Sequence, residues 1–383
     1  MEFGDRPRLR VLLDHFALLE DDRESWRVAH PLPEVLFLVV CGTIGACDDF
    51  DEIVEWGEDN LPFLRRFLPY HHGIPGSRWL RMLLNRIDPA LFSEMFQSWA
   101  AALRPDAPAL VAIDGKTSRA SHDRGSGRAA LHLVSAFATR ERLVLAQEAV
   151  AAGGCEQTTI PLLLERLAQK GQIAGALVSI DAIGCNAGTA QAILDAGADY
   201  LLAVKANQSG LRGEIERFFE DPGAGALATA SDLDKGHGRT EERSVSVSTR
   251  VGWLEGERRF PGEQRLPQLA MIARVVGRAW EKGKETSAVR FYVSSRPMTP
   301  QALAEAVRSH WAIENSLHWV LDVTFGEDKA RPHTGHGPAN MATIRHFAFN
   351  ILRTVNDKRS LKLRRNKAGR NPNYMAQIIG QSG

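Results

Sequence analysis

Apolar residues recur at helical spacing over the first part of the chain, which predicts a helical N-terminal domain at residues 1–105. The stretch "PEVLFLVVCGTIGA" is apolar on all sides, as in a buried helix. A second helix is expected in "SRWLRMLLNRIDP", with Ser77 as its N-cap and its end before Pro89. A third helix, "DPALFSEMFQSWAAAL", has Asp88 as its cap and Pro89 at its first position.

From residue 106 the pattern changes to short apolar runs, which are typical of strands, mixed with runs of helical spacing. Three strands are predicted first, and the polar "TRER" joins the second and third as a hairpin. In chain order the predicted segments are "LVAID", "LHLVSAFA", "RLVLAQEAV", "IPLLLERLAQKG", "ALVSID", "AGTAQAILDAG" and "DYLLAVKAN". The order β-β-β-α-β-α-β predicts an α/β fold with a mixed sheet over residues 106–207.

The remainder of the chain divides into three expected segments. Residues 208–296 contain one helical stretch and then alternating strand patterns, which predict a mostly β insertion. Residues 297–359 are expected to form two helices, and Thr299 caps the first and longer one. Residues 360–383 form a basic tail.

Charge is distributed unevenly, although the net charge of the whole chain is only +1. Residues 341–383 contain nine lysines or arginines and one acid, Asp357, a net charge of +8, so the other 340 residues carry −7. A basic tail on an acidic body suggests an anionic polymer as partner. The alternative is a solvated, partly disordered tail with no partner.

The sequence favours a cytoplasmic protein that does not cross a membrane. The longest apolar run, Val35 to Ile44, is about half the roughly 20 residues that a membrane helix needs. The first residues lack the apolar core of a signal peptide. The four cysteines form no C-x-x-C pair, which is typical of a reduced protein.

Two predicted strands each end on a single aspartate, Asp114 in "LVAIDGKTSR" and Asp181 in "LVSIDAIGCN". The first and fourth strands can be neighbours in this order of elements, so both carboxylates would project at one place. Two such carboxylates repel unless a cation lies between them, and hard oxygen ligands select Mg²⁺ or Mn²⁺. Three alternatives remain: a hairpin turn at "DG", an N-cap role for Asp181, and a dinucleotide-binding fold, whose G-x-G-x-x-G signature is missing.

A third acidic ligand is expected from the long helix, where His310, Glu314 and His318 recur every four residues. Glu314 is preferred because histidines and tryptophans surround it. Asp322, further along, is expected to anchor a neighbouring arginine or lysine. A zinc site of the two histidines and Glu314 is the rival interpretation, although it lacks the H-E-x-x-H spacing and a clear fourth ligand.

Seven motifs occur along the chain in an order that resembles one known family. They are "AIDGKTSRASHDR", "LHLVSAFA", "VSIDAIGCN", "LLAVKANQ", "DKGHGR", "SHWAIENSLHWVLDVTFGED" and "GPANMATIRHFAFNILR". They resemble the ISAs1 family of bacterial insertion-sequence transposases, which includes the H-repeat-associated proteins. The resemblance covers nearly the whole chain, and the helix motif around Glu314 is its most specific part.

The resemblance implies an RNase H-like catalytic domain whose DDE triad would be Asp114, Asp181 and Glu314. These residues would hold two Mg²⁺ or Mn²⁺ ions that activate water, and then a DNA 3′-hydroxyl, for attack on phosphodiesters. The implied partners are the terminal inverted repeats and target DNA, bound by a homodimer. Seven further residues are candidates for DNA contact or for support of the metal ligands: Lys116, Arg119, Lys205, His310, His318, Asp322 and Arg331.

The expected function is therefore that of a DNA transposase. Two alternatives remain open: a metal-dependent nuclease that cuts without joining, and a catalytically decayed relative that only binds DNA. The N-terminal helices are expected either to help recognise transposon ends or to pack against the catalytic domain.

Overall fold

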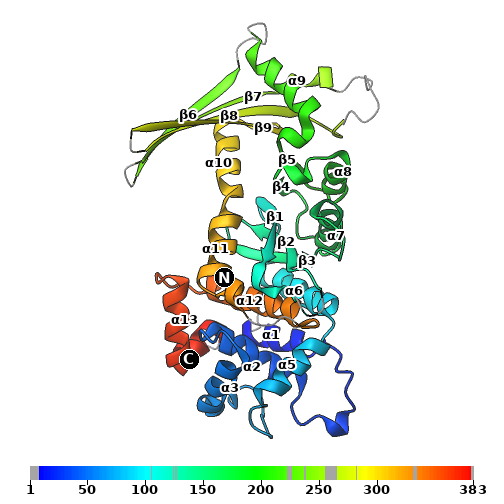
Figure 1. Ribbon diagram of the computed structural model, residues 1–383, viewed down its shortest axis with the longest axis vertical. Coiled ribbons are helices and arrows are strands. Elements are labelled where there is room, and N and C mark those ends of the chain that lie inside the picture. The colour runs from blue at the N-terminus through cyan, green and yellow to red at the C-terminus, as the bar shows by residue number, and fades with distance from the viewer. Residues whose placement is uncertain are drawn as a thin grey trace.

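The computed structural model describes residues 8–104, 106–123, 125, 127–221, 227–236, 239–254, 265–281, 283–330 and 334–380. The strands between residues 228 and 294, which we call the outer sheet, lie at one end of the molecule (Figure 1). A layer of helices lies at the other end, and the central strands lie between the two. In the described part of the chain, no helix combines the length and apolar character needed to span a bilayer.

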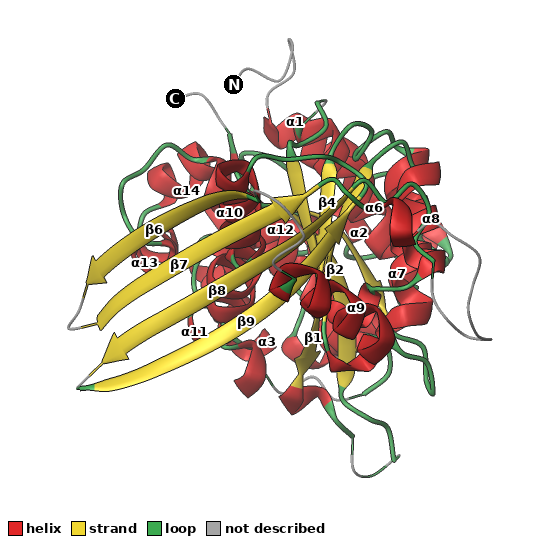
Figure 2. Ribbon diagram, turned by 90° about the horizontal axis from the view of Figure 1, so that it is seen from above, coloured by secondary structure: helices red, strands yellow, loops and turns green. Residues whose placement is uncertain are grey.

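The nine strands of the described residues form one mixed sheet, in the order β3-β2-β1-β4-β5-β9-β8-β7-β6. The strands β1–β2–β3 are antiparallel, β1–β4–β5 are parallel, and every pairing from β5 to β6 is antiparallel. Their bounds are β1 Leu110–Ser118, β2 Leu131–Ala138, β3 Leu143–Ala149, β4 Leu177–Ile180, β5 Asp199–Val204, β6 Ala228–Gly236, β7 Arg239–Ser248, β8 Met271–Glu281 and β9 Lys284–Ser294. The strands predicted between residues 208 and 296 thus extend the central sheet, as the long arrows in Figure 2 show.

Side-chain alternation along the inner strands divides the core between the two faces of the sheet. In β1, Val111 and Ile113 pack into the cluster formed with α7 (Glu156–Gln169), α8 (Ala187–Asp195) and α9 (Ser209–Glu220). Ala112 points the other way, into the cluster of α6 (Pro89–Leu103) and α12 (Gly337–Thr354). Burial on both faces explains why these strands are continuously apolar in sequence.

The N-terminal helices share one hydrophobic core with the C-terminal ones. Their bounds are α1 Arg8–Phe16, α2 Leu32–Ile44, α3 Phe50–Asp59, α4 Leu61–Leu64 and α5 Ser77–Arg86, followed by α6. Asp88 caps α6 as predicted, because its side chain accepts the N–H groups of Ala90 and Leu91. The predicted cap of α5 is wrong by one residue: Gly76 is the N-cap, and Ser77 is the first helical residue.

The segment expected to be a basic tail is folded, which corrects that expectation. Residues 361–379 form α13 (Leu361–Arg370) and α14 (Pro372–Ile379), packed against α2 and α12. Arg365, only 3% exposed, donates to the Thr43 carbonyl through Nε and Nη2 at 3.1 and 2.9 Å, and to the Thr324 carbonyl. Part of the local positive charge therefore fastens helix ends together and is not available to a polymer.

The predicted long helix of residues 299–325 is interrupted. It consists of α10 (Pro300–His310), a π-helical turn at Glu314–His318 and α11 (Trp319–Val323). Its beginning is as expected, since Thr299 accepts the N–H of Ala302 and Pro300 follows. Short 3-10 turns occur at Ser25–Arg27, Arg119–Ser121, Ala182–Gly184, Ala206–Gln208, Gly252–Leu254 and Glu327–Lys329.

Candidate active site

The two predicted aspartates lie at the same level on neighbouring strands. In the parallel pair β1–β4, Ile113 is opposite Ile180, and the next residues are Asp114 and Asp181. β4 ends there, whereas β1 continues to Ser118 along β2. The end of β4 leaves the edge of β1 open at the point where both carboxylates emerge.

Neither structural alternative for these aspartates is correct. β1 runs on through Gly115, so Asp114 does not begin a hairpin turn. Asp181 precedes a 3-10 turn without a side-chain capping hydrogen bond, and the helix that follows, α8, is capped by Asn186. Both carboxylates are therefore free of the local roles that their sequence context suggested.

The third carboxylate is presented by the π-helical turn. The N–H of Trp319 bonds to the carbonyl of Glu314, five residues back, which defines this turn. His310, Glu314 and His318 all lie on the side of the aspartates, since the first two line a cavity with Asp114 and His318 Nδ1 lies 3.7 Å from Asp114 Oδ2. Within the π-helical turn, Glu314 is exposed and His318 is 8% exposed. Such turns inside helices are frequent at functional sites.

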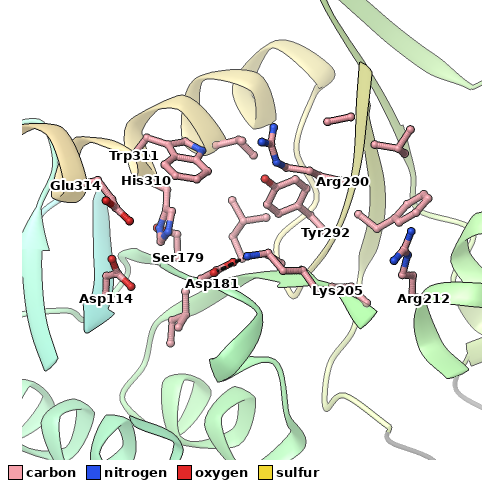
Figure 3. A pocket seen from close by; sticks show the side chains of 18 residues that line it. Asp114, Ser179, Asp181, Lys205, Arg212, Arg290, Tyr292, His310, Trp311 and Glu314 are labelled. Carbon is pink, nitrogen blue, oxygen red and sulfur yellow. Dashed lines mark hydrogen bonds and ion pairs between the residues drawn. The ribbon is translucent and has the colours of Figure 1, made fainter. Parts of the chain in front are cut away.

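Asp114, Asp181 and Glu314 line one cavity of about 360 Å³ (Figure 3). The first two come from the sheet, and Glu314 reaches in from the helical segment above it. Other polar or aromatic side chains of the cavity are Ser179, Lys205, Arg212, Arg290, Phe291, Tyr292, His310 and Trp311. Three acidic groups and three basic groups thus face one space.

Asp114 is a buried carboxyl group with a second carboxylate nearby. Burial raises the pKa of its carboxyl group to about 7, and the nearby Glu314 carboxylate adds to the increase. His318 lies closest among the imidazoles, with Nδ1 3.7 Å from Asp114 Oδ2, but burial lowers the pKa of His318 to about 4. The histidine is therefore neutral near pH 7 and supplies no counter-charge.

Asp181 has a cationic partner. Lys205 Nζ donates to its Oδ2 at 2.6 Å, as the dashed line in Figure 3 shows. Burial alone would raise the pKa of Asp181, but the hydrogen bonds from Lys205 and the Ala182 backbone, together with the charge of Lys205, outweigh burial, and the pKa lies below its usual value. The two aspartates thus differ in charge state because only one has a lysine beside it.

The donor set fits a hard divalent cation. All three acidic ligands are carboxylates, and the buried Asp114 has the Glu314 carboxylate nearby. Within the described ranges, no three acidic, histidine or cysteine side chains are already gathered around one ion position. The zinc alternative has no more support, since His310, Glu314 and His318 do not form such a group among the described residues either.

Lys116, a candidate for DNA contact or for support of the metal ligands, is paired with carboxylates in this structure. Its ammonium, 11% exposed, lies 2.7 Å from Asp322 Oδ1 and 2.8 Å from Glu327 Oε2. Glu327 is itself 3% exposed, and Arg345 Nη1 lies 3.7 Å from its other oxygen. The expectation that Asp322 pairs with a neighbouring basic residue is confirmed, and Lys116 is that residue.

The other candidates are more varied. Lys205 and His310 line the carboxylate cavity. The backbone N–H of Arg119 donates to Asp328 Oδ1 at 3.1 Å, and its side chain is exposed beside the site. Arg331 lies outside the described residues.

A hydrogen-bonded series of three side chains near Asp114 was not predicted from the sequence. Thr117 Oγ1 is 2.7 Å from His132 Nδ1, and His132 Nε2 is 2.7 Å from Glu156 Oε1. A Cβ at Gly115 would lie 2.2 Å from that same Glu156 oxygen. A glycine inside a strand often marks such a close approach, so Gly115 was the available signal.

The comparisons with known proteins agree with this architecture. Residues 105–351 match the Transposase DDE domain family, and residues 13–100 match the DDE_Tnp_1-associated family. The chain therefore belongs to the DDE transposase family, which confirms the resemblance inferred from its motifs.

Two relatives are similar over nearly their whole length. The "H repeat-associated putative transposase YhhI" of Escherichia coli K12 is 33% identical over 98% of this chain and 99% of its own. The "Putative transposase YncI" of Escherichia coli O157:H7 is 34% identical over 97% and 95%. Among solved structures, the piggyBac transposase in its synaptic complex with hairpin DNA has a TM-score of 0.44 and 10% identity, over 98% of this chain and 79% of that one.

Proposed function

We propose that this protein is the DNA transposase of an insertion sequence, and that Asp114, Asp181 and Glu314 are its metal-binding catalytic residues. The observation that carries the proposal is their arrangement: three carboxylates far apart in sequence line one cavity in a chain of the DDE transposase family. Phosphodiester chemistry needs such oxygen ligands, because divalent cations stabilise both the attacking and the leaving oxygen.

We further infer an RNase H-like scaffold for residues 110–204. The support is the strand order β3-β2-β1-β4-β5, in which three antiparallel strands precede two parallel ones. The strands β6–β9 enter between β5 and α10, so the insertion separates Asp181 from Glu314 in sequence.

The protein's own residues supply binding and positioning. Asp114, Asp181 and Glu314 would hold Mg²⁺ or Mn²⁺, which, when bound, activates a hydroxyl nucleophile and stabilises the departing oxygen. Asp114 would release its proton to bind the cation, because burial and the Glu314 carboxylate raise the pKa of its carboxyl group to about 7. Lys205, paired with Asp181 and 55% exposed, is placed to hold a DNA phosphate at the same site.

The partners implied are the element's terminal inverted repeats and the target DNA, bound by a homodimer in the cytoplasm. Arg212 and Arg290 line the cavity with Lys205, so positive charge surrounds the carboxylates. For the N-terminal helices, packing explains more than end recognition does: Leu80 and Leu84 of α5 are fully buried.

The proposal is tested with purified protein and DNA that carries the element's ends. Glu314→Gln should abolish cleavage and leave DNA binding nearly intact, because the site loses a metal ligand but no phosphate contact. Asp322→Asn is the matched control on the same helical segment, and it should retain measurable cleavage. Cleavage that persists in Glu314→Gln contradicts the assignment, and cleavage without joining of the 3′ end identifies a nuclease.

A further inference from the structure

Two contacts in a row join β1 to the helical segment that carries Glu314. His318 Nδ1 lies 3.7 Å from Asp114 Oδ2, and one turn later Asp322 Oδ1 lies 2.7 Å from Lys116 Nζ. The two strand residues are about 6.6 Å apart along β1, and the two helical residues are about 6 Å apart along their axis. Because these spacings match, the segment runs alongside β1 in the same direction (Figure 1).

Lys116 shares its positive charge between two carboxylates of this segment. Its side chain is 11% exposed, and Nζ lies 2.8 Å from Glu327 Oε2 as well as close to Asp322. Burial lowers the pKa of the Lys116 ammonium, but the charge of Glu327 and the hydrogen bonds to both carboxylates raise it more, so the pKa lies above its usual value. The ammonium therefore stays charged near pH 7 and bridges the strand and the segment.

The turn at the end of the segment, Glu327–Lys329, is fastened on more than one side. Glu327 is 3% exposed, and its second oxygen lies 3.7 Å from Nη1 of Arg345, a residue of α12 that is 5% exposed. The neighbouring Asp328 accepts the backbone N–H of Arg119 at 3.1 Å. The turn thus contacts β1, the residue after β1 and α12, so the segment cannot shift along the strand without breaking buried ion pairs.

The carboxylates of the proposed metal site repel one another when no cation lies between them. Asp114 and Glu314 line the same cavity, and the Glu314 carboxylate adds to the increase that burial causes in the pKa of Asp114. Alternate residues of a strand face the same side, so Lys116 projects from β1 on the side of Asp114. Its ion pairs therefore hold the segment of Glu314 on this strand against the repulsion.

The two lysines near the carboxylates differ in what they can contact. Lys205 is 55% exposed and lines the cavity, so a phosphate can reach it. Lys116 is 11% exposed and is not among the residues that line the cavity. Its effect on the site is therefore indirect, through the segment that it holds.

We propose that Lys116 is a positioning residue of the metal site: its ion pairs with Asp322 and Glu327 hold the Glu314 segment against β1, so that Glu314 and Asp114 are in place before a cation binds. The inference rests on the proposed function and adds to it a residue that contacts neither the metal nor DNA. Ligands that are already held together bind a cation more tightly than ligands that must first be brought together against their repulsion.

The test measures the affinity of the intact protein for Mn²⁺ alone, without DNA, by titration calorimetry. Lys116→Met should weaken Mn²⁺ binding by about 10- to 100-fold, as the loss of a group that orients metal ligands does. The loss of a nearby positive charge by itself has the opposite effect, because it strengthens the attraction between the carboxylates and Mn²⁺. The sign of the change thus separates positioning from charge. Lys116→Arg keeps a cation on the same strand position and should restore most of the affinity.

Folding of the variants is checked by circular dichroism and urea unfolding. Lys116→Met leaves Glu327 beside Arg345, so this buried carboxylate keeps one cationic partner. The double variant Lys116→Met with Asp322→Asn removes one charge of each sign, and its Mn²⁺ affinity should fall in the same way. It serves as the test if the single variant does not fold.

Arg104→Met is the matched control. Arg104 Nη1 lies 2.6 Å from Glu141 Oε2, and the two side chains are 16% and 20% exposed, but Glu141 lies in the turn between β2 and β3, near the start of β1. This variant should lose stability and keep its Mn²⁺ affinity.

Two results would overturn the inference: Mn²⁺ binding by Lys116→Met that is as tight as in the original protein or tighter, and an equal loss of affinity in Arg104→Met. Failure of the proposed function is distinguishable, because Glu314→Gln would then bind Mn²⁺ as tightly as the original protein. That result would refute the assignment of the metal ligands and, with it, this inference.

Discussion

Asp114→Asn should stabilise the metal-free protein, although it removes a proposed catalytic residue. Burial and the Glu314 carboxylate raise the pKa of Asp114 from 3.8 in the unfolded chain to about 7 in the native state. Ionisation of this side chain therefore opposes folding. Asparagine fills the same space without charge, so the penalty disappears.

The size and the sign follow from proton linkage. Below about pH 4 the carboxyl group is protonated in both states and costs nothing. As the pH rises towards 7, the unfolded chain ionises first, and the native state loses about 1.36 kcal/mol of stability per pH unit. The total loss is about 4 kcal/mol above pH 7, of which about 2.3 kcal/mol arises between pH 5 and pH 7.

The assay is urea unfolding of both proteins with a chelator at several pH values. The free energy of unfolding of Asp114→Asn should exceed that of the original protein by an amount that grows from pH 5 to pH 7 and then stays constant. Asp181→Asn is the control and should lower the free energy of unfolding, because Lys205 stabilises the ionised Asp181 in the native state and the substitution removes that partner. A pH-independent difference, or destabilisation by Asp114→Asn, would refute the reasoning.

Three further predictions concern stability and are checked by urea unfolding. Gly115→Ala should displace Glu156, since a Cβ would lie 2.2 Å from its Oε1. The free energy of unfolding should fall by about 1–2 kcal/mol. In the double variant with Glu156→Gln, the two losses of stability should not add. Glu327→Gln should cost about 3–5 kcal/mol, because Lys116 would remain buried with a weakened partner, and a loss below 1 kcal/mol would contradict this pairing. Arg365→Lys should destabilise nearly as much as Arg365→Ala, since a lysine cannot replace the guanidinium's several bonds to carbonyl groups, and full stability of the lysine variant would show otherwise.

The acidic pair and the elements around it could be predicted from local sequence. The lone aspartates after apolar runs, the β-β-β-α-β-α-β order and the capped start of α10 are patterns that each segment carries by itself. Hydrophobic spacing reports which side of an element is buried, and this information is local. The neighbouring positions of Asp114 and Asp181 follow from topology alone.

Other features depend on contacts between distant segments. The π-helical turn that presents Glu314 is only five residues long, and over so short a stretch the spacing of apolar residues does not distinguish it from an α-helix. The pairing of Lys116 with Glu327, 211 residues away, has no signal in the local sequence of either residue. Which charges pair depends on distances in the folded chain, and charge type alone does not determine it.

The sequence by itself determined the family, the α/β class, the acidic residues and the strands of the insertion. Only the tertiary structure decided that β6–β9 continue the central sheet, that the basic C-terminal segment packs as helices, and that Lys116 pairs with Asp322 and Glu327. The physical reason is that propensity and periodicity are properties of short segments, whereas cavities and buried ion pairs arise where segments pack together.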